Sequence, residues 1–452
     1  MNAPRTIAGV DPAGLCHGCG TCAGICPVGA IRMAMDDRRG VFHPVVAMDV
    51  CIDCGRCRAV CPGQAVDFDA LNRQVFGQLP ADPWMGNYRS IHIAHAVDER
   101  IRFEGSSGGL VTALLVGALK TGRIDGAVVA RMSRERPLEA ECFVARTEAE
   151  LKSAAGSKYA PTAPGAVLRE LRGENGRFAF VGLPCQIHGL RQLQRLEPRL
   201  AEKIPLAMGL MCSNNATCAG TEYFLRRWKI RREQVAALRF REGGWIQNYN
   251  TVVSLKDGRS VKLPRAGSRD GNRRTSYLHN SIYHCDFVVP RCLVCLDHAA
   301  ELSDLAFGDP RLPHLAREGG SGKSLVIVRS AAGAELMAAA TESGWIESSP
   351  ELDLDTFRKA QSMAFKMQAP ARLGAYRWLG KAVPEYVTSR IRPARAGDVF
   401  SLAAYLPSFF GGHPGLRFWI RPYSAARYGW KWVAGRIARV KSKWRGQTGA
   451  AK

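Results

Sequence analysis

The apolar residues of this chain fall into short runs that alternate with helix-like stretches from about residue 85 onward. Runs of strand length, bounded by glycine, proline and polar residues, lie at 90–97, 126–131, 178–183, 204–211, 251–255, 304–307 and 325–328. Stretches with the apolar spacing of helices lie at 108–120, 186–196 and 332–343. Alternation of this kind is typical of α/β domains. We therefore expect residues 85–345 to form an α/β domain.

Three other segments flank this body. Residues 10–70 are rich in cysteine, residues 346–400 are expected to be a helical linker region, and residues 401–452 form a basic, aromatic tail. No apolar run reaches the ~20 residues that a membrane-spanning helix needs. Residues 1–15 lack the basic-then-apolar profile of a secretory signal. We therefore expect a cytoplasmic protein.

The chain has 15 cysteines, and in a reducing compartment such a number favours metal or redox ligation over disulfides. Eight of them form a repeat, Cys16-x2-Cys19-x2-Cys22-x3-Cys26-Pro27 followed by Cys51-x2-Cys54-x2-Cys57-x3-Cys61-Pro62. In this dicluster ferredoxin spacing, three thiolates of one run and the last cysteine of the other hold each [4Fe–4S] cluster. We assign one cluster to Cys16, Cys19, Cys22 and Cys61, and the other to Cys26, Cys51, Cys54 and Cys57. Residues 10–70 are thus expected to form an α+β, ferredoxin-like dicluster domain.

A pair of zinc sites is the alternative explanation of this repeat. Zinc motifs usually bring two CxxC pairs separated by a loop, rather than a repeated four-cysteine run that ends in Cys-Pro. Zinc-dependent nucleic-acid binding would account for the formal charge of +23 but not for that repeat. Covalent haem is excluded because no CxxCH occurs. The iron–sulfur interpretation is therefore preferred, and nucleic acid is not expected as a partner.

Four cysteines in the body form a second constellation. Cys185 and Cys212 each follow a probable buried strand, and the carboxyl edge of an open α/β sheet is where ligands bind. Cys292-x2-Cys295 adds two thiolates at metal-ligand spacing. These four could hold a third cluster, with Cys285 as a rival ligand. Free cysteines are often small buried apolar residues, and this is our interpretation of Cys142, Cys218 and Cys285.

Two polar, glycine-containing segments are candidates for a phosphate or a ring cofactor. Ser106-Ser107-Gly108-Gly109 precedes an apolar helix, where serine caps and bare backbone amides suit an anion, although they could simply cap the helix. Gly156-Ser157-Lys158-Tyr159 supplies a cation, a hydroxyl and an aromatic ring, or could be a surface turn. Neither GxGxxG nor a Walker motif is present, so a standard NAD or ATP site is unsupported. No histidine constellation identifies a catalytic acid or base.

The order of these motifs resembles one family. After the dicluster module and the two glycine-containing segments come the following, in order: Val181-Gly182-Leu183-Pro184-Cys185-Gln186, Cys212-Ser213, Phe240-Arg241-Glu242-Gly243-Gly244-Trp245, Cys292-x2-Cys295 and Phe307-Gly308-Asp309. This arrangement resembles the beta subunit of coenzyme F420-reducing hydrogenase and its dehydrogenase relatives over roughly residues 10–345. The same family includes reductases of a chlorophyll derivative, so the resemblance leaves the substrate open. The long basic C-terminal extension departs from the hydrogenase subunit and puts a hydrogenase partner in doubt.

The resemblance implies an iron–sulfur flavoprotein that passes electrons between a hydride carrier or reducible substrate, FAD and [4Fe–4S] clusters. A flavin suits such a chain because it can meet both a two-electron hydride carrier and one-electron clusters. Carried onto this sequence, the third cluster would be held by Cys185, Cys212, Cys292 and Cys295. The flavin would be lined by Ser106, Ser107, Gly108, Gly109, Gly156, Ser157, Lys158 and Tyr159. The alternative is a flavin-free, polyferredoxin-like carrier that relays electrons between proteins.

The tail has a pattern of its own. Residues 401–452 contain no Asp or Glu, but ten Lys or Arg and ten aromatic residues. Trp430, Val433, Ile437, Val440 and Trp444 share one face of a helix that has basic flanks, which is typical of an interfacial membrane helix. We expect the tail to bind an anionic membrane surface at the inner face, with docking to an acidic protein partner as the alternative.

Overall fold

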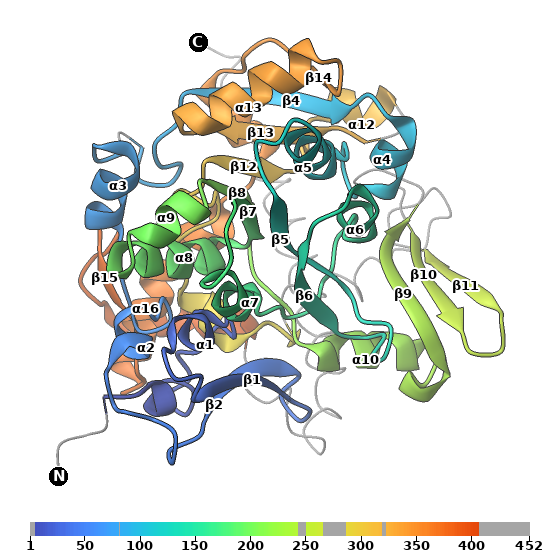
Figure 1. The fold of residues 1–452 in the computed structure, drawn as a ribbon. Coiled ribbons are helices and arrows are strands. Elements are labelled where there is room, and N and C mark those ends of the chain that lie inside the picture. Colours follow the sequence, from blue (N-terminus) through green and yellow to red (C-terminus); the bar gives the residue numbers. More distant parts are fainter. Residues whose placement is uncertain (1–4, 81, 243–249, 265–285, 319–321, 406–452) are drawn as a thin grey trace, which may run out of the picture.

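The computed structural model describes residues 5–80, 82–242, 250–264, 286–318 and 322–405 (Figure 1). The N-terminal part combines short helices with a hairpin. Its elements are η1 (Ile7–Gly9), α1 (Thr21–Ile25), β1 (Ile31–Asp36), β2 (Val41–Val46), α2 (Arg56–Ala59), β3 (Ala65–Asp67) and α3 (Phe68–Phe76). Helices α1 and α2 follow the same structural rule in the two halves of the repeat. Each begins after a left-handed glycine, Gly20 with φ 82° and Gly55 with φ 74°, a conformation that favours glycine.

The body is built on one large mixed sheet, as expected for an α/β domain. Within the described residues this sheet has eight strands in the order β14-β4-β13-β12-β8-β7-β5-β6. The strands are β4 (Ser90–Ala96), β5 (Gly126–Met132), β6 (Ala140–Ala145), β7 (Phe178–Gly182), β8 (Leu206–Leu210), β12 (Leu305–Gly308), β13 (Ser324–Val328) and β14 (Ile346–Ser348). Strands β12, β8, β7 and β5 are mutually parallel, and β4 runs in the same direction because it pairs antiparallel to β13, which pairs antiparallel to β12. The carboxyl ends of these five strands therefore lie along one edge.

Helices cover both faces of the sheet. One layer contains α5 (Leu110–Lys120), α6 (Glu148–Ser153) and α13 (Ala331–Glu342), and the opposite one contains α7 (Pro164–Leu171), α8 (Pro184–Leu196) and α9 (Arg199–Lys203). The alternation along a strand explains this division, because successive side chains point to opposite faces. On β7, Phe178 and Phe180 join the core under α8, whereas Ala179 joins the core under α5.

The strands and helices expected from the apolar pattern are all present within two residues at each end. The strand expected at 251–255, however, lies in a separate sheet of order β11-β10-β9, drawn to one side in Figure 1. Its strands are β9 (Val235–Glu242), β10 (Asn250–Leu255) and β11 (Ser260–Pro264). The pattern missed β6 and β14, which lie at the two edges of the large sheet and are short or half-buried, so their apolar signal is weak. The other described elements are α4 (Glu99–Glu104), α10 (Cys218–Arg227), η2 (Arg232–Gln234), η4 (Pro290–Val294) and α12 (Pro313–Glu318).

The segment 346–400, expected to be a helical linker, is helical but is packed into the core. It contains α14 (Leu354–Ala360), α15 (Ala364–Met367), α16 (Ala369–Trp378) and β15 (Glu385–Val387), and η5 (Ala396–Tyr405) follows. Phe357 and Arg372 are fully buried, and β15 pairs in parallel with β3 of the N-terminal part. This segment therefore joins the cysteine-rich part to the α/β body. The predicted tail helix, with its stripe from Trp430 to Trp444, lies outside the described residues. None of the helices in the described ranges is long and apolar enough to cross a membrane.

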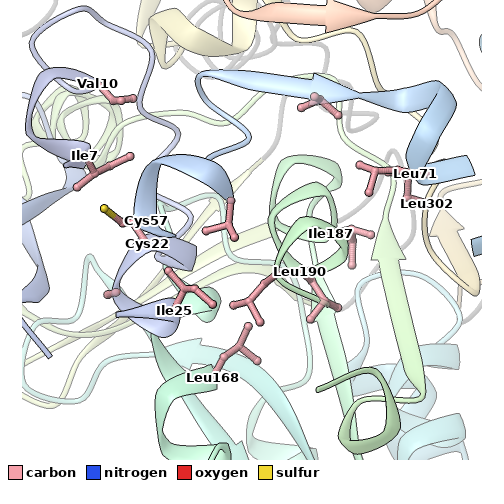
Figure 2. Close-up of a cluster of buried hydrophobic side chains, with 14 of the residues drawn as sticks. Ile7, Val10, Cys22, Ile25, Cys57, Leu71, Leu168, Ile187, Leu190 and Leu302 are labelled. Atoms are coloured by element: carbon pink, nitrogen blue, oxygen red, sulfur yellow. The ribbon is translucent and has the colours of Figure 1, made fainter. Parts of the chain in front are cut away.

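The N-terminal part docks on the body by a close backbone contact between α1 and α7. The N–H of Gly165 donates to the carbonyl of Cys19 at 2.9 Å, and a Cβ at Gly165 would lie 2.5 Å from the Thr21 nitrogen. Around this contact one apolar cluster includes Ile25 of α1 and Leu168 of α7, which Figure 2 shows with Cys22 and Cys57. The two parts thus share a single core.

Replacing Gly165 with alanine should separate α1 from α7. The added methyl group would overlap the backbone of Thr21, and overpacking of this kind costs about 1–3 kcal/mol. We expect a correspondingly lower free energy of unfolding in chemical denaturation. Gly173→Ala is the control, because a Cβ at exposed Gly173 would meet nothing within 4 Å. Equal stability of the two variants would contradict this account of the interface.

Candidate functional site

The structure brings together Cys16, Cys19, Cys22 and Cys61, the four cysteines assigned to one cluster. Burial raises the pKa of the Cys22 thiol well above its usual value, and the sulfurs of Cys19, Cys61 and Cys16 raise it further. Burial and the sulfur of Cys19 likewise raise the pKa of Cys61, to about 12, against the opposing effect of backbone N–H groups. The N–H of Gly18 donates to Cys16 Sγ at 3.3 Å. These four sulfurs therefore share one environment.

The second set adjoins the first and reaches the surface. Burial raises the pKa of the Cys57 thiol, and the sulfurs of Cys54 and Cys26 add to this increase. Cys51 packs at the edge of the same apolar cluster as Cys26 and Cys57, whereas Cys54 is exposed. The sulfur of Cys57 also contributes to the raised pKa of Cys22, so the two sets are neighbours.

The four cysteines of the body also come together. Cys185 lies in the first turn of α8 after β7, Cys212 lies two residues after β8, and Cys292 and Cys295 lie in and after η4. Burial raises the pKa of the Cys185 thiol, and the sulfurs of Cys295, Cys292, Cys19 and Cys212 raise it further, in that order. Cys19 belongs to the first set. The three sets of cysteines are therefore neighbours in space. The body set adjoins the first set, and the first set adjoins the second.

The other cysteines lie elsewhere. Cys142 is on β6, and Cys218 begins α10 in a small apolar cluster with Ala140 and Ala160. Burial raises the pKa of each thiol to about 12, and no cysteine of the three sets contributes to either shift. Cys285, the rival ligand, lies outside the described residues.

Buried cations surround the sulfurs of the body. Lys366 of α15 and Arg291 of η4 are 2% and 1% exposed. The guanidinium of Arg291 donates to the carbonyls of Gly63 and Pro62 and to the Tyr386 hydroxyl, while its Nη1 has no partner among the described residues. Both ring nitrogens of His17 are buried and likewise have no partner in the part of the chain that the structure describes. Anionic clusters would supply what these donors lack, so the residues fit iron–sulfur clusters.

Sequence reasoning missed Lys366. A single charged residue within the apolar run Met363-Ala364-Phe365-Lys366-Met367 was the signal that could have found it. In the part of the chain that the structure describes, no three His, Cys, Asp or Glu side chains are placed to share a single metal ion. A cubane differs from a single ion in taking each of its four cysteines at a separate iron.

The two polar, glycine-containing segments also meet at the carboxyl edge of the sheet. The Ser157 N–H donates to Ser106 Oγ, and the Ser107 hydroxyl donates to Asp309, which follows β12. Arg241 Nη1 donates to the same carboxylate at 3.0 Å. Burial alone would raise the pKa of the Asp309 carboxyl. The charge of Arg241 and the hydrogen bond from Ser107 outweigh burial, so the pKa lies below its usual value.

An aromatic contact completes this polar group. Tyr159 packs edge-on against Phe240, with ring centroids 5.4 Å apart, and therefore joins the second segment to β9. Positions 243–245 of the motif that begins at Phe240 lie outside the described residues.

Gly108 and Lys158 have structural roles that differ from those expected. The Gly108 N–H, expected to face a phosphate, donates to Ser324 Oγ at 3.0 Å, and a Cβ there would lie 2.8 Å from the Ala94 carbonyl oxygen. Gly108 is therefore needed for close packing on β4 and β13. A Cβ at Gly109 would lie 2.5 Å from the Ile101 carbonyl oxygen in α4, so Gly109 also packs closely. The Lys158 ammonium is partly buried and donates to the carbonyls of residues 154–156, so it caps the end of α6. Burial lowers its pKa to about 7.

A chain of hydrogen bonds links the sulfurs of the body to this polar group. The Cys212 N–H donates to the His298 carbonyl at 2.9 Å, and the His298 ring bonds the Gln361 side chain at 3.2 Å. Gln361 in turn donates to the carbonyl of Asp309. The structure therefore places a buried thiol set beside a group of hydroxyls, a carboxylate and a guanidinium.

Comparison with known proteins gives matches over most of the described chain. The model of the coenzyme F420 hydrogenase/dehydrogenase beta subunit N-terminus matches residues 91–169, and that of its C terminus matches residues 175–353. Together they cover more than half of the 452 residues. A 4Fe-4S dicluster domain matches residues 15–65.

Individual relatives agree with these matches. The coenzyme F420 hydrogenase subunit beta of Methanothermobacter thermautotrophicus is 29% identical over 275 residues, which are 59% of this chain and 86% of that protein. The coenzyme F420-dependent sulfite reductase of Methanocaldococcus jannaschii is 25% identical, over 78% of this chain and 49% of that protein. A chain of the F420-reducing [NiFe] hydrogenase complex from Methanosarcina barkeri shares the fold, with a TM-score of 0.50 and 23% identity over 65% of this chain and 95% of that chain.

Asp309 should be required to hold this polar group together. Asp309→Asn removes the charge that compensates Arg241, which is 5% exposed, and breaking a buried pair by removing one partner costs about 3–5 kcal/mol. We expect a loss of this order in the free energy of unfolding, measured by chemical denaturation. Asp257→Asn is the control because its carboxylate pairs with Arg259 at an exposed turn, and it should leave stability unchanged. If both variants unfold alike, Asp309 does not organise the site.

Proposed function

This chain belongs to the coenzyme F420 hydrogenase/dehydrogenase beta subunit family, and from that premise we propose that it passes electrons between a hydride carrier, FAD and three [4Fe–4S] clusters. It is an iron–sulfur oxidoreductase of this family's type. The observation that carries the proposal is the arrangement of the cysteines in three adjoining sets. Cys19 lies beside Cys185, and Cys22 lies beside Cys57. Each set offers four thiols, the number that a cubane takes.

The order of the sets indicates a path for single electrons. The set of Cys185, Cys212, Cys292 and Cys295 would be the inner station, next to the polar group that contains Asp309. The set of Cys16 would follow, and the set of Cys26 would be the outer station, because Cys54 is exposed there. A redox partner protein would exchange electrons at this exposed end.

Each set of cysteines has a backbone hydrogen-bond donor at a sulfur, which suits an anionic cluster. Backbone N–H groups of Gly18, Ala30 and Asn215 donate to the sulfurs of Cys16, Cys26 and Cys292, respectively. Hydrogen bonds to sulfur stabilise negative charge and tune the potential. The apolar cluster around Ile25 and Leu168 includes Cys22, Cys26 and Cys57 and would keep water away from their sulfurs.

FAD would be held by the polar group at the carboxyl edge. When bound, it supplies exchange of two electrons as hydride with a carrier and of single electrons with the clusters. The hydroxyls of Ser106 and Ser107, the Ser157 backbone and Tyr159 would line it, and Asp309 would position Ser107. Gly108, Gly109 and Lys158 would support this site through their packing on β4 and β13, on α4 and at the end of α6, respectively.

Coenzyme F420 is the candidate hydride carrier because several relatives are named for it, including the hydrogenase subunit and the sulfite reductase. A chloroplastic 7-hydroxymethyl chlorophyll a reductase of Oryza sativa subsp. japonica is 25% identical over 54% of this chain and 47% of its own length. Relatives of this chain therefore include a protein that is named for a substrate other than F420. The alternative to a flavoenzyme is a flavin-free electron carrier. Binding of the tail to an anionic membrane surface stays a prediction from sequence.

The iron content should show whether the chain holds three clusters or two. Anaerobic reconstitution should give about twelve irons per chain, with about eight in Cys292→Ser/Cys295→Ser, because each cubane holds about four. The control Cys142→Ser/Cys218→Ser removes a half-buried and a buried thiol outside the sets and should keep about twelve irons. A plateau near eight irons in the unmodified chain, unchanged in the Cys292/Cys295 variant, would leave two clusters and no third.

FAD binding should depend on the serine hydroxyls. A hydrogen bond to a charged group contributes roughly 1.5–3 kcal/mol, so Ser106→Ala/Ser107→Ala should weaken FAD binding at least about tenfold in a fluorescence titration. Ser153→Ala is the control because its exposed hydroxyl bonds only the Glu150 carbonyl. Unchanged affinity in the double variant would place the cofactor elsewhere. Absence of FAD binding by the unmodified protein would favour the flavin-free carrier.

A further inference from the structure

Two consecutive large apolar side chains are exposed at the end of α16. Trp378 is 64% exposed and Leu379 is 45% exposed. Among the described residues, no other two neighbours in the chain are both large, apolar and exposed. Single apolar residues on a surface are ordinary, but an adjacent tryptophan and leucine form a continuous apolar projection. A projection of this kind is typical of a binding surface.

The backbone holds this projection in one position. Gly380 follows it with φ 65°, the left-handed conformation that favours glycine, and ends the helix. The N–H of Lys381 turns back and donates to the Tyr376 carbonyl at 2.9 Å. The helix itself is anchored by Arg372, which is fully buried and donates to backbone carbonyls of two other elements. The two apolar side chains are therefore presented on a fixed turn, which lowers the entropy that binding would cost.

Cations border the projection. Arg377 precedes it and Lys381 follows it, and both are exposed. Residues 361–405 contain seven Lys or Arg but only two Asp or Glu. One of these two acids, Asp398, is buried and paired with Arg392, so it adds little negative charge to the surface. The C-terminal segment therefore presents apolar side chains among positive charges.

The same segment leads into the basic tail. Phe400 lies in η5, which packs on α16, and at 79% it is the most exposed large apolar side chain in the described ranges. Residues 406–452 then contain ten Lys or Arg and no Asp or Glu. Tryptophan favours the interface of a bilayer, and cations beside it meet anionic headgroups. The charge and the apolar character of the segment are thus both complementary to anionic lipid.

We propose that the turn of Trp378 and Leu379 inserts into the interface of an anionic membrane. Arg377 and Lys381 would meet the headgroups on either side of it. The membrane contact predicted for the tail thereby extends to the folded body, and it depends on neither the clusters nor FAD. After this turn the chain enters β15, which pairs with β3 of the cysteine-rich part. Docking here would therefore hold the cysteine-rich part near the lipid surface, where a redox partner in the membrane would be within reach.

Co-sedimentation of the full chain with vesicles tests the proposal. Vesicles of phosphatidylcholine with phosphatidylglycerol present an anionic surface, and vesicles of phosphatidylcholine alone are the comparison. Trp378→Ser/Leu379→Ser removes the projection. The control Leu196→Ser/Trp228→Ser removes the same two residue types at the ends of α8 and α10, where they are 43% and 37% exposed. Circular dichroism and iron content establish that each variant is folded.

The unmodified chain should bind the anionic vesicles, and Trp378→Ser/Leu379→Ser should bind them at least about ten times more weakly, because it no longer buries the two side chains. The control should bind as the unmodified chain does. Equal affinity of the two variants would overturn the proposal. Absence of binding by the unmodified chain would overturn it as well, and would indicate that the tail or an acidic protein covers this turn.

A second variant provides the test if the serine variant does not fold. Arg377→Gln/Lys381→Gln keeps the apolar side chains but removes two cations, so affinity should fall at least about tenfold at low salt and change little at high salt. Arg134→Gln/Lys256→Gln is the control, because it removes the same formal charge at exposed positions elsewhere. An equal loss of affinity in these two variants would show only an effect of net charge, and the proposal would be wrong.

Discussion

The close backbone contact between α1 and α7 is the interaction on which the proposed electron path depends. Gly165 lets the two helices approach until its N–H in α7 meets the carbonyl of Cys19, two residues before α1 begins. Cys19 in turn lies beside Cys185, so the contact that joins two parts of the fold also joins two sets of thiols. The pairing of β15 with β3 fixes the opposite side of the N-terminal part. Without these contacts the cysteine-rich module would be a separate domain, and its thiols would not adjoin those of the body.

The second constraint is the compensation of buried charge. Thiols in the interior have raised pKa values because burial disfavours the thiolate, and ligation to iron requires that thiolate. The chain offsets this cost with backbone N–H groups aimed at sulfur and with Arg291 and Lys366, which have no carboxylate partners in the described ranges. Other buried cations are compensated in two ways: Arg390 pairs with Glu301 and Arg191 pairs with Asp304, whereas Arg329 and Arg372 donate to backbone carbonyls.

The sheet connects these features to the polar group proposed to hold FAD. Its parallel strands direct their carboxyl ends to one edge, and segments far apart in the sequence meet there. Ser107, Arg241 and Asp309 form one bonded group, and Gln361 and His298 link it to Cys212. Two of these linking contacts are made by Gln361, which directly follows α14 and lies beyond the region matched by the family. The C-terminal segment is thus part of the site and not merely a connection.

The sequence by itself determined most strands of the large sheet and the identity of the cysteines, because strand and helix patterns and ligand spacings are local. The spacing of Cys16, Cys19 and Cys22 predicted that these sulfurs share an environment, since one run folds around a tight turn, and the repeated motif supplied Cys61 from the other run. Only the tertiary structure decided that Gly108 serves close packing and that Lys158 caps a helix, because both roles depend on strands or carbonyls that approach in space. It alone brought Lys366 to Cys295, seventy-one positions earlier in the chain. A charge so distant in sequence carries no local signal of its partner, and the fold supplies the partner by burying both together.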